Sequence, residues 1–288
     1  MADKIITLKN DALTVEVSTK GAEIQSIVNK KGTSFLWSGD KEVWSGRAPV
    51  LFPICGGLKD DKYILGGKEY SLVKHGFAKT VFYEVEKSTE LELSLLYKPE
   101  DDTKASFPYD YEFRVLYSLC KSSLKVTYKV NNLSDKTMYF STGAHEAYAC
   151  PEGIEEYSIV FDKAETLDSY ILDGNLLEHN TIRIMENSKE LPLKYDFFKV
   201  DAIVFKNLNS RKVTLVKRNG KRKVQVEFPG HDYFVLWTKP QAKYICIEPW
   251  CGIQDPVDSD YDITHKEGII ALPKGESFEA SHVISVED

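Results

Sequence analysis

The sequence of 288 residues predicts an all-β protein, a large antiparallel β-sandwich that forms one domain over residues 1–288. Apolar and polar residues alternate in many short runs, and turn residues separate these runs. Strands do not alternate with helices, and no strongly helix-periodic stretch exceeds about two turns. The chain also has no internal repeat and no linker-like change of composition. These features are typical of a β-sandwich with many strands.

The first half of the chain carries the clearest strand patterns. Residues 13–18 and 24–28 predict an opening hairpin or meander, residues 35–37 a short strand, and Gly66-Gly67 the turn of a hairpin. Long alternating runs follow at residues 91–97, 111–119 and 124–130. Because the last two runs are joined by a short connection, we expect them to be antiparallel neighbours.

The second half is less regular. Small residues break the pattern at 141–148, and the polar segment 164–199 gives the weakest signal of any region. Further short strands are predicted at residues 202–205, 213–216, 224–228, 234–237, 269–272 and 278–286.

Composition excludes several classes of function. The net charge of −7 argues against nucleic acid as a partner. Five cysteines without a CxxC pair indicate reduced thiols rather than a disulfide framework. The N-terminus lacks the apolar core of a signal peptide, and no apolar run approaches the ~18 residues of a membrane span. We therefore expect a cytoplasmic protein that does not contact a membrane.

Residues 244–252 (YICIEPWCG) form the most informative stretch. Alternation places Cys246 and Glu248 on one strand face, and Pro249 is expected to end the regular pairing. Two interpretations of Glu248 remain open at this point. It is either a solvated residue at a strand end or an ionised base on the floor of a cleft, beside Trp250.

His75 and His145 stand out among the six histidines, because each lies in a break of small residues where loops carry function. A structural role remains open for each. The sequence lacks H-E-x-x-H and C-x-x-C spacings, so we predict no metal. It also lacks a Gly-x-Ser-x-Gly elbow. A glycosidase needs two carboxylates at one bond, so that class stays open, with Glu248 and one of these partners: Glu146, Asp201, Asp232 or Asp255.

Six stretches in order resemble the aldose 1-epimerases, or galactose mutarotases, and among them the LacX-like branch. They are residues 46–53 (GRAPVLFP), 74–78 (KHGFA), 142–145 (TGAH), 201–205 (DAIVF), 236–240 (LWTKP) and 247–252 (IEPWCG). The resemblance runs over nearly the whole chain. It implies a large antiparallel sandwich with a sugar cleft on one face, no cofactor, and a small sugar as the partner of a monomer or homodimer.

The resemblance also implies roles. His145 matches the general acid and Glu248 the general base, which together open the sugar ring. Arg47 and His75 match residues that contact the sugar, and Asp201 matches a carboxylate that binds its hydroxyls. Trp237 or Trp250 offers an apolar platform for the sugar, and core packing is the alternative for either.

Three questions remain open. Arg47 has a structural alternative, in which it only ties its proline-rich loop to a carboxylate. Relatives often have proline after the histidine, where this chain has Glu146, and Glu146 or Asp201 is expected to raise the pKa of His145 if it lies close. With ordinary pKa values of about 4.3 and 6.5, the acid and base would leave only a narrow pH optimum.

Two alternatives to a free-hexose epimerase follow. One is a hexose-6-phosphate 1-epimerase, which would need cations such as Lys74 or Lys79 beside His75. The other is a sugar-binding or regulatory protein of the same fold without turnover.

Overall fold

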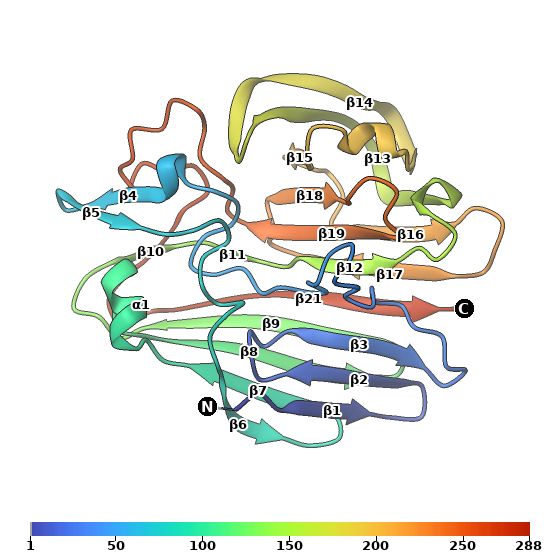
Figure 1. Ribbon diagram of the computed structural model, residues 1–288, viewed down its shortest axis with the longest axis horizontal. Coiled ribbons are helices and arrows are strands. Elements are labelled where there is room, and N and C mark those ends of the chain that lie inside the picture. The colour runs from blue at the N-terminus through green and yellow to red at the C-terminus, as the bar shows by residue number, and fades with distance from the viewer. Residues whose placement is uncertain (1) are drawn as a thin grey trace.

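The computed structural model describes residues 2–288 and consists mostly of strands, with 52% of residues in strands and 6% in helices (Figure 1). One sheet of 14 strands dominates it, and its neighbours pair antiparallel throughout. In spatial order the main path is β11 (Thr142–Gly143), β19 (Tyr244–Cys251), β18 (Tyr233–Trp237), β15 (Ile203–Lys206), β13 (Tyr157–Asp173), β16 (Lys212–Lys217), β17 (Lys223–Glu227), β21 (Ser277–Glu287), β9 (Ser123–Asn132), β8 (Tyr111–Cys120), β7 (Glu92–Tyr97) and β6 (Glu84–Ser88). Beside this path, β12 (Glu146–Ala149) pairs with β19, and β14 (Leu176–Pro192) pairs with β13.

Smaller elements complete the fold. A three-stranded meander contains β1 (Ile5–Lys9), β2 (Leu13–Ser18) and β3 (Ile24–Asn29). Two further pairs are β4 (Lys62–Leu65) with β5 (Lys68–Ser71) and β10 (Met138–Phe140) with β20 (Ile270–Leu272). The helical segments among the described residues are α1 (Asp101–Ser106) and the 3-10 turns Lys59–Asp61, Ile154–Glu156 and Tyr195–Phe198. No helix within residues 2–288 is long and apolar enough to span a bilayer.

The core lies between the meander and the large sheet. Figure 1 shows β1–β3 in front of β7–β9, and buried side chains of both groups belong to one hydrophobic cluster. The Tyr117 hydroxyl of β8 donates to the Ala22 carbonyl between β2 and β3, which ties the two layers together. Along β8 every second residue is buried, as the alternating sequence predicts. The expected all-β fold with antiparallel β8 and β9 is therefore confirmed.

Residues 164–199 are more regular than their sequence indicates. Most of them belong to β13 and β14, two strands of 17 residues each that form a long hairpin with its turn at Gly174. The register shifts at four places, and most of β14 is exposed. Register shifts interrupt the period-2 pattern, and the buried face of β13 carries the polar residues Glu165 and Ser169, so the sequence shows no clear hydrophobic alternation.

Pro249 does not end the pairing of β19, which continues to Cys251. The Pro249 carbonyl accepts a hydrogen bond from the Ala144 N–H, so the side of the residue that lacks an N–H faces the interruption between β11 and β12. The proline therefore removes no ladder hydrogen bond, and Glu248 lies within the strand rather than at its tip. Residues 35–37 were predicted as a short strand, but they do not form one. Leu36 makes only an isolated bridge with Tyr148.

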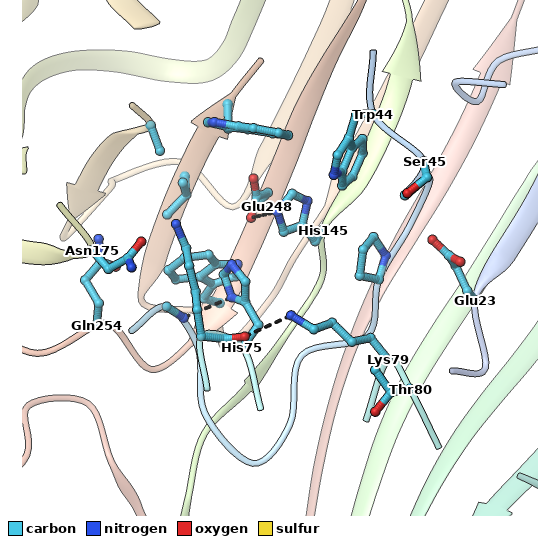
Figure 2. A pocket seen from close by; sticks show the side chains of 18 of the residues that line it. Glu23, Trp44, Ser45, His75, Lys79, Thr80, His145, Asn175, Glu248 and Gln254 are labelled. Atoms are coloured by element: carbon cyan, nitrogen blue, oxygen red, sulfur yellow. Dashed lines mark hydrogen bonds and ion pairs between the residues drawn. The ribbon is translucent and has the colours of Figure 1, made fainter. Parts of the chain in front are cut away.

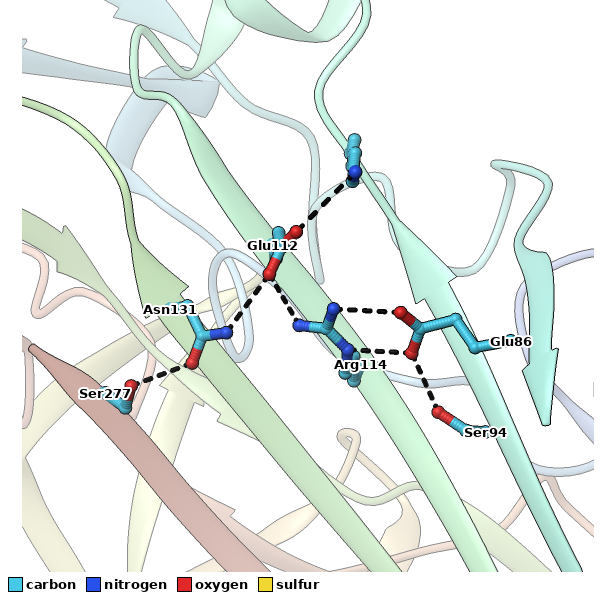
Figure 3. Close-up of polar contacts among 7 residues, drawn as sticks. Glu86, Ser94, Glu112, Arg114, Asn131 and Ser277 are labelled. Carbon is cyan, nitrogen blue, oxygen red and sulfur yellow. Dashed lines mark hydrogen bonds and ion pairs between the residues drawn. The ribbon is translucent and has the colours of Figure 1, made fainter. Parts of the chain in front are cut away.

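A ladder of polar side chains crosses five adjacent strands on the solvent face of the sheet (Figure 3). Arg114 on β8 donates through Nε and Nη2 to both Glu86 oxygens at 2.7 and 2.9 Å, and through Nη1 to Glu112 at 2.7 Å. Asn131 continues the ladder by donating to Glu112 at 3.2 Å, and it accepts from Ser277 at 2.8 Å. Hydrogen bonds from Arg114 lower the pKa of both Glu86 and Glu112.

We expect Arg114→Met to lower the free energy of unfolding by about 1 kcal/mol at pH 7, after allowance for solvent screening. Carboxyl pKa values that are lowered in the folded state stabilise it at neutral pH, and this contribution disappears as pH falls through the folded-state values. Urea unfolding at pH 7 and pH 3, with the exposed Arg218→Met as control, measures the difference. An equal loss at both pH values would show that the ion pairs are not responsible.

Candidate active site

A cavity of about 580 Å³ opens over β18 and β19 and is lined by side chains from distant parts of the chain (Figure 2). Of the six residues that the sequence singles out for the site, five line this cavity: His75, His145, Asp201, Trp237 and Glu248. Arg47 is not among its lining residues. The fold thus brings together one strand residue of β19, one of β18 and three residues of separate loops.

His145 and Glu248 face each other within the cavity. Glu248 projects from β19, and His145 lies in the interruption between β11 and β12. The His145 Nε2 and Glu248 Oε2 atoms are 3.5 Å apart, and the two side chains are 10% and 1% exposed. Nδ1 of His145 and Oε2 of Glu248 have no hydrogen-bond partner within residues 2–288. An acid and a base are therefore adjacent on the cavity lining, and each has one buried atom without a hydrogen-bond partner.

Burial disfavours charge on both groups. It raises the pKa of Glu248 well above the usual value, and it lowers the pKa of His145 to about 3. The positive charges of Lys74 and Lys79 lower the pKa of His145 further. Both pKa shifts favour the neutral forms, so the titratable proton of the pair is favoured on Glu248 over His145. This corrects the expectation that a neighbouring carboxylate raises the pKa of His145.

Glu146 lies on the opposite side of its strand from the cavity. Its Oε1 atom is 2.9 Å from Nε2 of His282, and both side chains are almost fully buried. Glu146 is absent from the cavity lining, as alternation along β12 requires. The pair links β12 to β21, so Glu146, at the position where relatives often have proline, and His282 both have a structural role in the core.

His75 is fixed in one tautomer by its own loop. The Gly56 N–H donates to Nδ1 at 3.1 Å, so the neutral ring carries its proton on Nε2. Burial and the charges of His145, Lys79 and Lys74 hold the pKa of His75 well below its usual value. His75 is thus a neutral N–H donor beside His145, with ring centroids 5.4 Å apart. Its backbone has a φ of 67°, which is a strained conformation for a non-glycine residue.

Three tryptophans form the walls. Trp44 stacks on His145 with ring centroids 5.4 Å apart, and Trp237 meets the same ring edge-on at 5.7 Å. Trp250 packs edge-on against His75 at 5.7 Å and donates from Nε1 to the Ala144 carbonyl. Trp237 and Trp250 both line the cavity, which answers the question left open between cleft and core.

Trp44 is a site residue that was not predicted. Its only local signal is the glycine two residues later, since a Cβ at Gly46 would approach the Trp44 ring to 2.5 Å. Lys74 and Lys79, which the sequence named as cations beside His75, also line the cavity, as do Asn175 and Gln254. The positions of the last two depend on contacts between segments far apart in the chain, and no local pattern marks them.

Asp201 is the one carboxylate, among the four considered as partners of Glu248, that lines the cavity. It forms an ion pair with Lys74 at 3.5 Å, and both side chains are partly exposed. Asp255 instead forms a buried ion pair with Lys266 at 2.6 Å, and Asp232 is largely exposed. Of these four, the one carboxylate in the cavity is therefore already paired with lysine, which disfavours it as a second acid for glycoside hydrolysis.

The Arg47 guanidinium is engaged within its own loop region. Its Nε atom donates to the Ser38 carbonyl at 2.8 Å, and its Nη1 donates to the side chain of Gln25 at 2.6 Å. The Arg47 backbone N–H donates to Glu23 Oε1 at 2.8 Å. These contacts favour a structural role for Arg47, although its guanidinium binds an amide and a carbonyl rather than the carboxylate that the sequence interpretation named.

One group within residues 2–288 has the donor atoms of a metal site. His145, Cys246 and Glu248 each offer an atom, and these atoms lie within 4.8 Å of one another. Burial raises the pKa of the Cys246 thiol well above its usual value, so the sulfur keeps its proton, whereas metals bind the thiolate. A metal would occupy the same His145 and Glu248 atoms that face the ligand space. The prediction that no metal takes part remains a prediction.

The fold and the cleft define a class of protein, large antiparallel β-sheet proteins that carry a histidine and a carboxylate on the floor of a cleft. The chain matches the family model "Aldose 1-epimerase" over residues 4–285. It is 32% identical to the plasmid-encoded protein LacX of Lactococcus lactis subsp. lactis, over 98% of this chain and 99% of LacX. The chain therefore belongs to the aldose 1-epimerase family.

Solved structures of related proteins have the same fold as this chain. A galactose mutarotase related enzyme from Lactobacillus acidophilus superposes with a TM-score of 0.95 at 33% identity, over 99% of this chain and 98% of that one. A galactose mutarotase-like protein from Lactobacillus casei gives a TM-score of 0.94 at 26% identity, over 99% and 100% of the two chains. The fold is thus galactose mutarotase-like, as the sequence resemblance implies.

Proposed function

We propose that this protein is an aldose 1-epimerase that interconverts the α and β anomers of a hexose. The observation that carries the proposal is the pair of His145 and Glu248, 3.5 Å apart on the floor of the cavity in a member of this family. Ring opening needs one group that takes the C1 hydroxyl proton and one that protonates the ring oxygen. An adjacent acid and base meet that need without a nucleophile or a redox step.

In the proposed mechanism Glu248 removes the C1 hydroxyl proton while His145 protonates the ring oxygen, and the C1–O5 bond breaks. Rotation about C1–C2 in the open aldehyde and the reverse transfers give the other anomer. The roles require the pair's single proton on His145, whereas burial favours Glu248. Both forms carry the same number of protons, so the sugar's hydroxyls need only shift the proton within the pair.

The remaining lining residues have supporting roles. His75 offers an N–H to a sugar oxygen, because its Nδ1 already accepts from Gly56. Asp201 accepts from sugar hydroxyls, while Trp44 and Trp237 confine the sugar and exclude water around His145. Exclusion of water strengthens the polar contacts within the site.

We expect Glu248→Gln to reduce the polarimetric rate of mutarotation by about 10²-fold or more, because the base is lost. The variant should unfold at the same or a higher temperature, since a buried ionisable carboxyl is replaced by a neutral amide. The pKa of Glu248 is raised in the folded state, so its ionisation opposes folding as pH rises, and the advantage of the variant should grow from pH 4 upward.

Glu279→Gln, at an exposed position of β21, serves as the control. A folded Glu248→Gln protein with the wild-type rate would refute the assignment of the base. Binding of hexose by a wild-type protein that does not speed mutarotation would instead favour the non-catalytic sugar-binding alternative.

We expect a broad pH optimum in place of the narrow one that ordinary pKa values give. A pair that keeps one proton is disabled only when it gains a second proton, near the lowered pKa of His145, or loses its last one, near the raised pKa of Glu248. Wild-type kcat/KM should thus stay flat across the interval from about 4.3 to 6.5 and beyond both ends. A bell confined to that interval would show that the two groups titrate independently.

A phosphorylated hexose is a second candidate substrate, and one observation favours it. Lys79 is partly buried in the cavity wall, where its Nζ donates to the Lys74 carbonyl at 2.8 Å. No carboxylate within residues 2–288 lies within ion-pair distance of it. Burial and the charge of Lys74 lower its pKa. A cation in this position without a counter-charge suits an anionic substituent of the sugar.

If a phosphate binds there, Lys79→Met should reduce kcat/KM for glucose 6-phosphate by about tenfold or more, the usual scale of a lost charge-assisted hydrogen bond. The same variant should change kcat/KM for free glucose and galactose by less than about threefold. Lys243→Met, an exposed lysine away from the cavity, is the matched control. Faster turnover of the free sugars than of their 6-phosphates, with no effect of Lys79→Met, would remove this candidate.

A further inference from the structure

Two glutamine side chains line the cavity, and only one of them has its partners within the protein. The Gln25 amide accepts from Arg47 at 2.6 Å and donates to Glu23 at 3.2 Å. Gln254 is 5% exposed, and its buried Oε1 atom has no partner within residues 2–288. A buried amide oxygen without a hydrogen bond is unfavourable, so a ligand that supplies one would recover the loss.

Two consecutive glycines make room for this amide and for a second one. A Cβ at Gly56 would lie 2.5 Å from Cβ of Gln254, and a Cβ at Gly57 would lie 2.8 Å from Cβ of Asn175. Figure 2 shows Asn175 and Gln254 together at one end of the cavity, with Trp44 and Ser45 at the other. His145 and Glu248 lie between the two ends.

Backbone contacts hold the amide end in place. The Asp255 N–H donates to the Gly57 carbonyl at 2.9 Å, and the Leu177 N–H donates to the Asp255 carbonyl at 2.9 Å. The buried ion pair of Asp255 with Lys266 anchors the same loop. The turn of the β13–β14 hairpin, which carries Asn175, is thereby fixed against the segment that carries Gln254. This preorganisation lowers the entropic cost of binding a ligand.

The two side chains that define this end, Asn175 and Gln254, are neutral. Elsewhere in the lining, Asp201 is already paired with Lys74 at 3.5 Å. A neutral group rich in hydroxyls therefore suits this end better than an anion. One amide offers a donor and an acceptor side by side, which matches two adjacent hydroxyls of a sugar ring.

We propose that Gln254, assisted by Asn175, binds a pair of adjacent ring hydroxyls remote from C1 and thereby selects among hexoses by the configuration of those hydroxyls. The proposal rests on the proposed function only for the placement of C1 at His145 and Glu248. Gln254 is then a specificity-determining residue, for which Gly56 makes room, while Gly57 makes room for Asn175.

The test uses ligands that cannot undergo mutarotation. 1,5-Anhydrogalactitol and 1,5-anhydroglucitol lack the C1 hydroxyl and differ only at C4, so titration calorimetry measures recognition of the ring hydroxyls without turnover. We expect Gln254→Leu to weaken binding of the preferred anhydrohexitol by about tenfold and to reduce the preference between the two. Asn175→Ala should weaken binding by a smaller factor, because Asn175 is exposed.

Gln225→Leu on β17 is the matched control, since Gln225 lies away from the cavity and should leave binding unchanged. The melting temperature of Gln254→Leu should equal or exceed that of the wild type, because an unpartnered buried amide is removed. Unchanged binding in Gln254→Leu, an equal loss in Gln225→Leu, or no binding of either anhydrohexitol to the wild type would each overturn the proposal. Binding that depends on Gln254 in a protein without mutarotase activity would support it and refute the proposed function.

Discussion

Pro249 has no N–H to donate, and the strand beside it is interrupted where that N–H would point. β12 pairs with residues 244–247 of β19, β11 pairs with residues 250 and 251, and the gap between them lies opposite Glu248 and Pro249. His145 occupies this gap. A continuous neighbouring strand would leave a carbonyl without a partner at the proline and would give His145 the fixed geometry of a paired strand residue. The break therefore places the acid against the base while the sheet remains paired on either side.

The cleft combines groups whose charges burial opposes. His145 and Glu248 are both desolvated, and the ammonium groups of Lys74 and Lys79 lie close enough to lower the pKa of His145. In the free site the proton is consequently favoured on the Glu248 carboxyl. The ionic form, with His145 protonated and Glu248 ionised, needs polar groups from a ligand. Such a site costs folding free energy, because buried polar atoms without partners are destabilising. The extensive aromatic core and the ion-pair ladder of the outer face lie elsewhere in the sheet and are independent of that cost.

Three glycines leave space for side chains that line the cleft. Gly46 leaves room for the Trp44 ring that stacks on His145, and Gly56 and Gly57 leave room for Gln254 and Asn175. Each of these glycines is close in space to a lining residue, and in two of the three cases that residue is remote in sequence. The width of the cleft is thus set by missing side chains on one loop, which explains why the segment at residues 46–57 is rich in glycine and proline yet forms no regular element.

The sequence by itself determined the all-β class and the long strands β7–β9, and it singled out His75, His145 and Glu248, since period-2 alternation and breaks of small residues are local signals. Asp201 and Trp237 were found through the resemblance of their motifs to the aldose 1-epimerases. Tertiary structure alone decided three other matters. The hairpin of β13 and β14 has register shifts, an exposed β14 and polar residues on the buried face of β13, so its sequence shows no clear hydrophobic alternation. Glu146 turns away from His145 because alternation on β12 directs it to His282, which follows it by 136 residues. Asn175 and Gln254 join the cleft only because loops from separate regions meet over β19, and contacts between distant segments leave no pattern in a local window of sequence.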